Sequence, residues 1–381
     1  MGTAPNGVLA MGDNKTPYTW TYNITVSQRA PWRSVAEFQY SGNRSRDMML
    51  HGPLSNIDLV PLGAFYKPDP KTGVINNPVD SSFPSTDYYP LANYTGMTLI
   101  GHGSYSNYNA FIASWQKQSG RATFTVNYTF SKVLGIRDNQ TDNGNGNGTT
   151  LWPYAMRQNY GVLNFDHTHI FNAAYVFNLP SPEKKSKLLG GVVNGWVMSG
   201  ITQLQSGAPI QGNTNGNLNV NWGCVNFTRS DGTTTCSGLS GQNWLGTSSV
   251  NLVPRVTCDP RSGLASGQYF NPSCFASPLP GTPGDIIWPY IKGPAFFNSD
   301  LAIYKNFAFK EHHRVELRFS AFNFLNHPLP QFGAGGNSDI KLNFATSTGA
   351  LSQTNTNPLT TGFPMFTVGR RVVEFAAKYN F

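Results

Sequence analysis

Strict alternation of apolar and polar side chains constrains the fold of this chain more than any other feature of its sequence. From Tyr18 to Ser27, the residues Tyr, Trp, Tyr, Ile and Val alternate with Thr, Asn and Ser, and Thr123 to Ser131 repeats the pattern. Successive side chains of a β-strand point to opposite faces, so each segment would present one apolar and one polar face. The sequence therefore predicts strands with one face suited to lipid and the other suited to water.

Seven further segments bring the predicted strands to nine: Ser34–Gly42, Tyr105–Lys117, Asp166–Leu179, Gly190–Gln205, Phe296–Phe307, Arg314–Asn326 and Phe366–Phe381. The links between these strands alternate in length. The short links are Gln28–Arg33, Gln118–Gly120, Pro180–Leu189 and Ala308–His313, and the long links are Asn43–Ser104, Gly135–Phe165, Ser206–Ala295 and His327–Met365. Short turns at one end of a sheet and long loops at the other are typical of bacterial outer-membrane barrels.

A soluble β-sandwich also alternates, and composition argues against it. Charged residues make up 12% of the chain, against about 25% in an ordinary soluble domain. The polar faces consist mostly of Thr, Asn, Ser and Gln, where a water-exposed sheet would carry Lys, Glu and Arg. No run approaches the ~18 apolar residues of a transmembrane helix, so any membrane span must be a strand. The predicted fold is all-β, an antiparallel transmembrane β-barrel with long extracellular loops.

The net charge of +8 raises the possibility of nucleic-acid binding, which the distribution of the charges disfavours. Lys and Arg are scattered along the chain and form no dense tract. A basic barrel facing the anionic lipid of the outer leaflet, lipopolysaccharide, is the preferred hypothesis. We therefore expect outer-membrane lipid, and no nucleic acid, among the partners.

The predicted strand count bears on how much of a barrel the sequence contains. An antiparallel barrel closes with an even number of strands, and nine is odd. The first residues, MGTAPNGVLAMGDN, lack the charged and apolar regions of a signal peptide. We therefore expect residues 1–381 to be the carboxyl-terminal portion of one barrel domain, a partial barrel whose remaining strands lie upstream.

The last segment, GRRVVEFAAKYNF, alternates and ends on an aromatic residue. Phe375, Tyr379 and Phe381 share one face of this predicted strand, and a terminal Phe closing such a strand resembles the signal for outer-membrane insertion. An ordinary edge strand that ends in Phe is the alternative. The signal implies the barrel insertion machinery as a partner.

Eight sequence blocks are spread from about residue 40 to the end of the chain. They are YSGNR from Tyr40, VPLGA from Val60, SNYNAF from Ser106, YTFSK from Tyr128, FDHTHIFNAAYVFNLP from Phe165, GWVMSGITQLQSGAPI from Gly195, GPAFFNSDLAIYKNF from Gly293 and FNFLNHP from Phe322. Together and in this order they resemble the Oar-like family of TonB-dependent receptors. The resemblance implies an outer-membrane transporter of a Gram-negative bacterium, driven by the TonB complex, that imports or exports an unidentified substrate. The family's plug, TonB box and amino-terminal domain have no counterpart in these residues.

All four cysteines fall within the predicted long loop Ser206–Ala295. Cys224 and Cys236 are 12 residues apart, and Cys258 and Cys274 are 16 apart. A loop facing an oxidising exterior favours two disulfides between these nearest neighbours. Zinc binding is the alternative, and the absence of a Cys-x-x-Cys spacing disfavours it.

Other candidate sites have plain structural explanations. Asp166, His167 and His169 could form a metal or acid–base site, but a polar strand end at the membrane boundary is favoured, because alternation points Asp166 away from the two histidines. His312 and His313 are read as part of a solvated turn. The segment Asn139–Thr150 is rich in Gly and Asn and is either a substrate-capturing loop or slack surface chain.

Six aromatic residues are read as interface girdle or lipid face rather than as a ligand box: Trp20, Tyr22, Trp115, Trp152, Trp196 and Tyr379. No nucleophile elbow, phosphate-binding loop or dinucleotide fingerprint occurs, so we expect neither an enzyme nor a cofactor. A surface adhesin or saccharide-binding protein anchored by its barrel is the alternative to a transporter. An outer-membrane enzyme ranks last.

Overall fold

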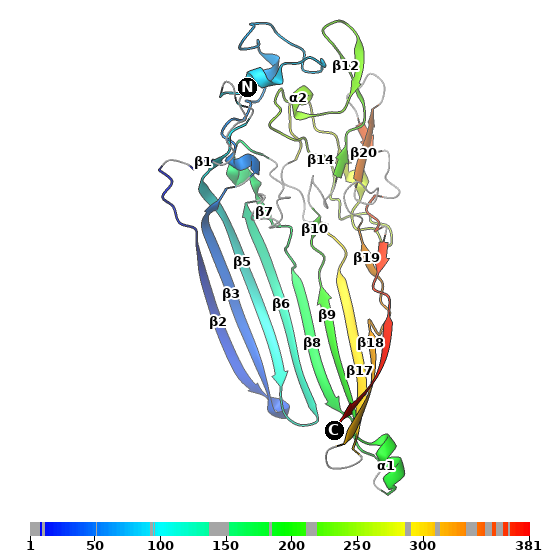
Figure 1. Cartoon of the computed structure of the whole chain (residues 1–381). Coiled ribbons are helices and arrows are strands. Elements are labelled where there is room, and N and C mark those ends of the chain that lie inside the picture. The colour runs from blue at the N-terminus through cyan, green and yellow to red at the C-terminus, as the bar shows by residue number, and fades with distance from the viewer. Residues whose placement is uncertain are drawn as a thin grey trace.

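The computed structural model describes a chain dominated by one antiparallel sheet (Figure 1). The described residues are 8–9, 12–50, 52–91, 94, 96–136, 152–182, 185–210, 219–285, 291–308, 313–332, 341–346, 353–355, 361–364 and 366–381. No helix among these residues has both the length and the apolar character needed to cross a membrane.

The main sheet follows the order of the chain. Its strands are β2 (Tyr18–Ala30), β3 (Ser34–Met49), β5 (His102–Lys117), β6 (Ala122–Ile136), β8 (His169–Asn178), β9 (Trp196–Gln205), β17 (Phe296–Ala308), β18 (Arg314–Phe322) and β23 (Val372–Asn380), with β7 (Tyr160–Val162) added beside β6. Every neighbouring pair is antiparallel. Each predicted strand overlaps a strand of this sheet, which has ten members where nine were predicted.

Several predicted boundaries were wrong for local reasons. The predicted strand Gly190–Gln205 begins six residues later, because residues Lys187–Val193 form the helix α1 and Gly195 (φ 77°) turns the chain into β9. Ser186 caps α1 by accepting a hydrogen bond from the Leu189 amide. The predicted strand Phe366–Phe381 is divided at Gly369 (φ 87°) into β22 (Phe366–Val368) and β23.

The connections alternate in length as predicted. Residues 31–33, 118–121, 179–195 and 309–313 form the short ones, and residues 50–101, 137–168, 206–295 and 323–371 form the long ones. Figure 1 shows the described parts of the long connections together at one end of the sheet, opposite the carboxyl terminus and α1. We call these four long connections the loop layer.

The loop layer contains short strands and helices of its own. The strands are β4 (Leu99–Ile100), β10 (Pro209–Ile210), β11 (Asn219–Asn221), β12 (Val225–Thr228), β13 (Thr234–Ser237), β14 (Arg255–Val256), β15 (Phe275–Ala276), β16 (Ile291–Lys292), β19 (Leu329–Gln331), β20 (Lys341–Thr346), β21 (Gln353–Asn355) and β22. β1 (Val8–Leu9), which precedes the main sheet in the chain, pairs with β4. The helices are α2 (Gly241–Trp244), η2 (Gly52–Ser55), η3 (Ala64–Tyr66), η4 (Ser85–Tyr88), η5 (Met156–Asn159) and η6 (Pro272–Cys274), and η1 (Pro31–Arg33) forms the short turn between β2 and β3.

The sheet is open along both edges in the described part of the chain. β2 lies at one end of the strand order and β23 at the other, and no pairing joins them. Eight antiparallel steps separate these two strands, so they run in the same direction. The buried apolar clusters lie in the loop layer, around Phe270 and Leu342, around Trp244 and Leu252, and around Val60 and Phe65.

Candidate functional site

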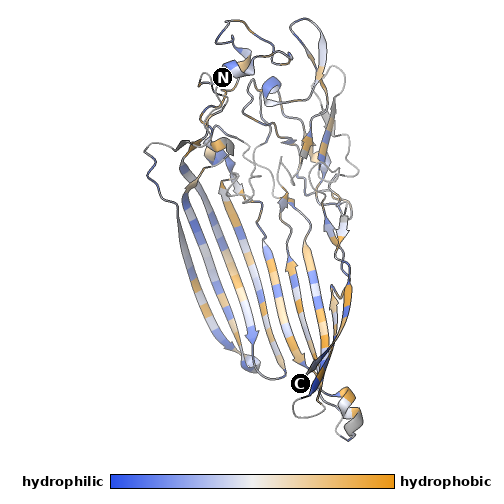
Figure 2. Ribbon diagram, in the orientation of Figure 1, coloured by the Kyte–Doolittle hydropathy of each residue, from blue (hydrophilic) through white to orange (hydrophobic). Residues whose placement is uncertain are grey.

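The register of the sheet places apolar side chains on one continuous face. Residues paired across an antiparallel ladder share a face. Val126 of β6 is opposite Trp115 of β5 and Ala173 of β8, and the same face continues to the pair of Phe319 in β18 and Phe375 in β23. Figure 2 shows hydrophobic and hydrophilic bands alternating along the strands. The alternation read from single strands therefore extends across the whole sheet.

Many large side chains of this apolar face are exposed. Trp20 is 68% exposed, Ile24 is 72% and Phe375 is 71%. Soluble proteins rarely expose a continuous apolar surface of this extent, because its contact with water is unfavourable. The face is therefore suited to contact lipid.

Aromatic side chains line part of the apolar face. The hydroxyls of Tyr22 and Tyr40 both donate to Oδ1 of Asn109, at 2.9 and 2.8 Å. Trp115 donates from Nε1 to the Ser34 hydroxyl at 2.9 Å. The prediction for Trp152 was wrong, because this residue lies in the loop layer and packs against its buried cluster with Tyr154.

The opposite face of the sheet is polar and borders a hollow of about 620 Å³. Residues of six neighbouring strands line it, from β5 to β18, among them Thr125, Ser199, Asp300, Arg318 and Ser320. One hollow can contact residues from six strands only on the inner side of a curved sheet. The polar face is therefore the concave one.

Charged side chains are concentrated on the polar face of the last strands. Arg318 forms an ion pair with Glu316 at 3.0 Å, and its guanidinium lies 4.8 Å from the centre of the Tyr304 ring. Glu374 and Lys378 of β23 border the same side of the sheet as Glu316 and Arg318, around a second hollow of about 500 Å³. This arrangement gives the concave face groups of both charges, which can contact polar or ionic solutes.

Asp300 belongs to the same wall and holds the end of β18. Its Oδ1 accepts hydrogen bonds from the Asn323 amide at 2.8 Å and from Asn298 Nδ2 at 3.0 Å. Sequence reasoning missed Asp300, Glu316, Arg318, Glu374 and Lys378 as a group. The available signal was the occurrence of charges at alternate positions in Arg314–Phe322 and Val372–Asn380.

Three of the long connections meet at the carbonyl oxygen of Val60. This buried oxygen accepts hydrogen bonds from the Thr247 hydroxyl at 2.6 Å and from the Tyr154 hydroxyl at 2.5 Å, and the Val60 amide donates to the Ser249 hydroxyl at 2.9 Å. Burial raises the pKa of Tyr154, which keeps its hydroxyl protonated as a donor. The loop layer is therefore a packed unit and not a set of independent loops.

The fourth long connection joins this unit through an apolar cluster. Leu342 and Phe344, from the connection between β18 and β23, pack with Ile210, Phe270 and Ile291 from the connection between β9 and β17. β11 and β20 of the same two connections pair in parallel.

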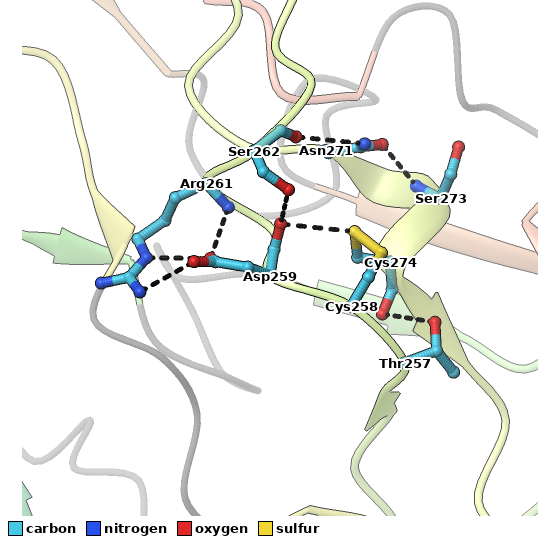
Figure 3. Close-up of a disulfide and its surroundings, with 8 residues drawn as sticks. All are labelled: Thr257, Cys258, Asp259, Arg261, Ser262, Asn271, Ser273 and Cys274. Carbon is cyan, nitrogen blue, oxygen red and sulfur yellow. Dashed lines mark hydrogen bonds and ion pairs between the residues drawn. A yellow bond between two sulfur atoms is a disulfide. The ribbon is translucent and has the colours of Figure 1, made fainter.

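Two disulfides lie in the connection between β9 and β17. Cys224 is joined to Cys236 across the β12–β13 hairpin, with 5.3 Å between their Cα atoms, and Cys258 is joined to Cys274 with 4.9 Å. Figure 3 shows the second bond beside a turn organised by Asp259. Whether these bonds form in the protein in its own membrane stays a prediction for chemical mapping.

Asp259 has an ion pair and a backbone contact in this turn (Figure 3). Its carboxylate accepts from Arg261 Nε and Nη2, both at 2.9 Å, and from the Arg261 amide at 3.0 Å. These hydrogen bonds, the side-chain ones foremost, lower the pKa of Asp259 to about 2. The carboxylate is solvent-exposed, so it stabilises the turn and is no candidate for acid–base chemistry.

The predicted candidates around Asp166 have three separate partners. Asp166 is buried before β8, where it pairs with Lys132 at 3.0 Å and accepts from the Val133 amide at 2.7 Å. His167 Nδ1 lies 2.6 Å from the Ser206 carbonyl, and His169 Nδ1 lies 2.8 Å from the Tyr128 hydroxyl. The structure therefore does not bring the three side chains to one point.

The predicted insertion residues lie on β23 and at its end. Phe375 and Tyr379 are on the apolar face, opposite Phe319 and Val315, and Phe381 is 90% exposed. The Tyr379 hydroxyl lies 2.5 Å from His313 Nδ1. His312 and the segment 139–150 lie outside the described residues, so their predictions stay untested.

The fold and its two faces define the class as an outer-membrane β-barrel protein. The sequence matches the family model of the outer membrane beta barrel domain over residues 2–371, and the chain belongs to this family. Its location is therefore the outer membrane, as predicted, and the family is one of membrane barrels and not of enzymes. No curated protein matches the sequence.

Two of the solved structures similar to this chain are outer-membrane transporters. The FrpB iron transporter from Neisseria meningitidis (F3-3 variant) is 10% identical with a TM-score of 0.39, over 98% of this chain and 33% of that one. The outer membrane transporter YddB from Escherichia coli is 10% identical with a TM-score of 0.37, over 98% of this chain and 34% of that one. The chain thus spans about a third of the length of both structures.

Proposed function

We propose that this chain forms the carboxyl-terminal part of the barrel wall of a TonB-dependent outer-membrane transporter of the Oar-like family. One observation carries the proposal: a sheet with a continuous exposed apolar face and a concave polar face bordering hollows. In a barrel, the apolar face contacts lipid and the polar face lines the lumen. The Oar-like sequence blocks quoted above support the assignment to this family.

The directions of the edge strands support a larger barrel. β2 and β23 run in the same direction, so they cannot pair with each other in an all-antiparallel barrel. An odd number of additional strands would complete the closure. In this proposal the other strands, the plug and the TonB box belong to further sequence of the parent protein, and the outer-membrane insertion machinery assembles the barrel.

The orientation follows from the connections. Short turns face the periplasm and long loops face the exterior in bacterial barrels. In this orientation the loop layer meets lipopolysaccharide and the substrate first. The substrate then passes along the concave wall that carries Asp300, Arg318 and Glu374.

Two measurements on the full-length parent protein test the proposal. In outer-membrane fractions, Ser199→Cys should react with a water-soluble maleimide, and Phe319→Cys should react only with a lipid-soluble one. The parent protein should also bind the periplasmic domain of TonB, and deletion of its TonB box should abolish that binding. A parent sequence without plug and TonB box would refute the transporter while leaving the barrel intact.

The second candidate is an adhesin or saccharide-binding protein in which the barrel is only an anchor. The packed, disulfide-closed loop layer favours it, because loops organised around Val60 and Phe270 form a stable outer surface. Retained binding of the parent protein to cell surfaces or glycans in the absence of TonB would favour this candidate.

A further inference from the structure

The short helix α1 has an apolar side that nothing in the described chain covers. Leu189, Val192 and Val193 are spaced i, i+3 and i+4, which places them on one face of the helix. They are 58%, 62% and 42% exposed. Exposure of three apolar side chains on a seven-residue helix is unfavourable in water, so something outside the described chain should cover them.

Two side chains fix α1 beside the apolar face of the sheet. Lys305 of β17 donates from Nζ to the carbonyl oxygens of Gly191 and Asn194, and Trp196 donates from Nε1 to the Val192 carbonyl at 2.8 Å. Trp196 and Lys305 are directly paired, and Met198 and Ile303, two residues further along the same strands, are apolar neighbours on the same face. The carboxyl-terminal turn of α1 is therefore attached at the edge of the lipid-facing surface.

Lys305 accounts for a charge at an otherwise apolar position. The residue is 3% exposed, and its ammonium lies 4.9 Å from the centre of the Phe307 ring and 5.7 Å from that of Trp196. The last carbonyls of a helix lack intrahelical partners, and an ammonium group satisfies them. Lys305 thus holds α1 in place instead of facing lipid.

We propose that α1 is an interfacial anchor that inserts Leu189, Val192 and Val193 into the periplasmic leaflet of the outer membrane. Phospholipid covers the apolar side of α1, because this side continues a surface that is itself lipid-facing. Lys185, just before α1, is exposed, and its positive charge is complementary to anionic head groups. The inference rests on the proposed orientation, in which the short connections face the periplasm.

Depth measurements on the full-length parent protein test the anchor. Val192→Cys is labelled with an environment-sensitive fluorophore and reconstituted in vesicles of phosphatidylethanolamine and phosphatidylglycerol that contain a shallow nitroxide-labelled lipid. The four cysteines of residues 1–381 are paired in the structure, so none of these four competes with the introduced thiol. Phe375→Cys is the control for the lipid face and Lys185→Cys is the control for water.

The lipid quencher should reduce the fluorescence at position 192 about as much as at 375, and several times more than at 185. Iodide in the buffer should quench position 185 alone. Quenching of position 192 by iodide would place it in water and overturn the anchor. Quenching by neither iodide nor the labelled lipid would place it beneath a protein partner and would also overturn the anchor. If iodide also quenches position 375, the proposed lipid face of the barrel is wrong. If iodide quenches position 192 and not position 375, only the anchor is wrong.

Discussion

The sheet and the loop layer use the same apolar residue types in opposite ways. In the sheet, Trp20 and Phe375 are about 70% exposed, whereas Phe65 and Phe270 in the loop layer are completely buried. Apolar side chains leave water in both regions. The loop layer achieves this by packing against itself, and the sheet achieves it by facing lipid.

The comparison teaches that each region is adapted to a different solvent. Backbone groups of the strands between the two open edges of the sheet are satisfied within the ladder, as a lipid environment requires. The loop layer instead depends on side-chain hydrogen bonds, such as those to the Val60 carbonyl, and on disulfides. Substitutions of the same kind should therefore have different consequences in the two regions.

The largest expected difference comes from truncating one phenylalanine in each region. Phe270→Ala leaves a cavity in the buried cluster of the loop layer and should cost about 3–5 kcal/mol of its stability. Phe375→Ala should cost much less, because lipid chains fill the vacated space. Hydrogen exchange of loop-layer peptides would measure the loss of stability in Phe270→Ala, and resistance of the folded barrel to unfolding in gels would measure it in Phe375→Ala. Equal losses of stability in the two variants would contradict the proposed difference between the two regions.

Charge insertion sharpens the contrast between the two faces of the sheet. Val126→Arg places a cation on the lipid face and should cost about 2–4 kcal/mol, whereas the same change on the lumen face costs little. Asn127→Arg is the matched control, because Asn127 is adjacent in β6 and points to the polar face opposite Ser114. Assembly yield and heat-modified gel mobility report the difference.

A soluble sandwich would also reject Val126→Arg, so the environment must be measured separately. Val126→Cys should react with a lipid-soluble maleimide and be shielded from a water-soluble one. Free labelling of Val126→Cys from water would show that the two faces have been assigned the wrong way round.

The sequence predicts the sheet well because alternation is local. Tyr18 to Ser27 and Thr123 to Ser131 show their two faces without any knowledge of neighbouring strands, and the positions of Gly and Pro between strands indicate the turns. α1 was missed because Val192 and Val193 also fit a strand, and only the Ser186 cap and Gly195 distinguish the two.

Contacts between distant segments were beyond local reasoning. The junction of Val60, Tyr154 and Thr247 joins three connections, and no spacing in the sequence relates these residues. Trp152 was assigned to the membrane interface for the same reason, since its residue type fits both a girdle and a buried cluster. The cysteine pairing could be proposed from the sequence because nearest-neighbour closure within one loop is a local argument, and it stays a prediction for peptide mapping.

Removal of a disulfide should have an effect that is confined to the loop layer. Closing a loop of about 15 residues contributes about 3 kcal/mol by limiting the unfolded chain. The double change Cys258→Ser and Cys274→Ser should therefore raise hydrogen exchange around Phe270 and leave the sheet unaffected. Mapping of non-reduced peptides of the native protein should first link Cys224 to Cys236 and Cys258 to Cys274. Free thiols or bound zinc would contradict the pairing.

The smallest expected effect concerns the pH dependence of the turn beside Cys258. The pKa of Asp259 is lowered to about 2 in the folded protein, from an ordinary value of 3.8, mainly by hydrogen bonds from Arg261. A depressed pKa means that the carboxylate stabilises the turn above pH 3.8, and that this stabilisation is lost as the pH falls toward 2. The carboxylate is solvent-exposed, so water and salt screen the interaction and the effect is modest.

The rate at which a phosphine reductant opens the Cys258–Cys274 bond reports this loss. The Asp259 carbonyl contacts the Cys274 sulfur at 3.5 Å, so loosening the turn should expose the bond. Asp259→Asn, which has no charge to lose, is the control for the reagent's own pH dependence. The rate for the native protein should lie below that of the variant at pH 5 and approach it as the pH falls toward 2. A constant ratio of the two rates would show that the ion pair of Asp259 with Arg261 does not hold this part of the loop layer.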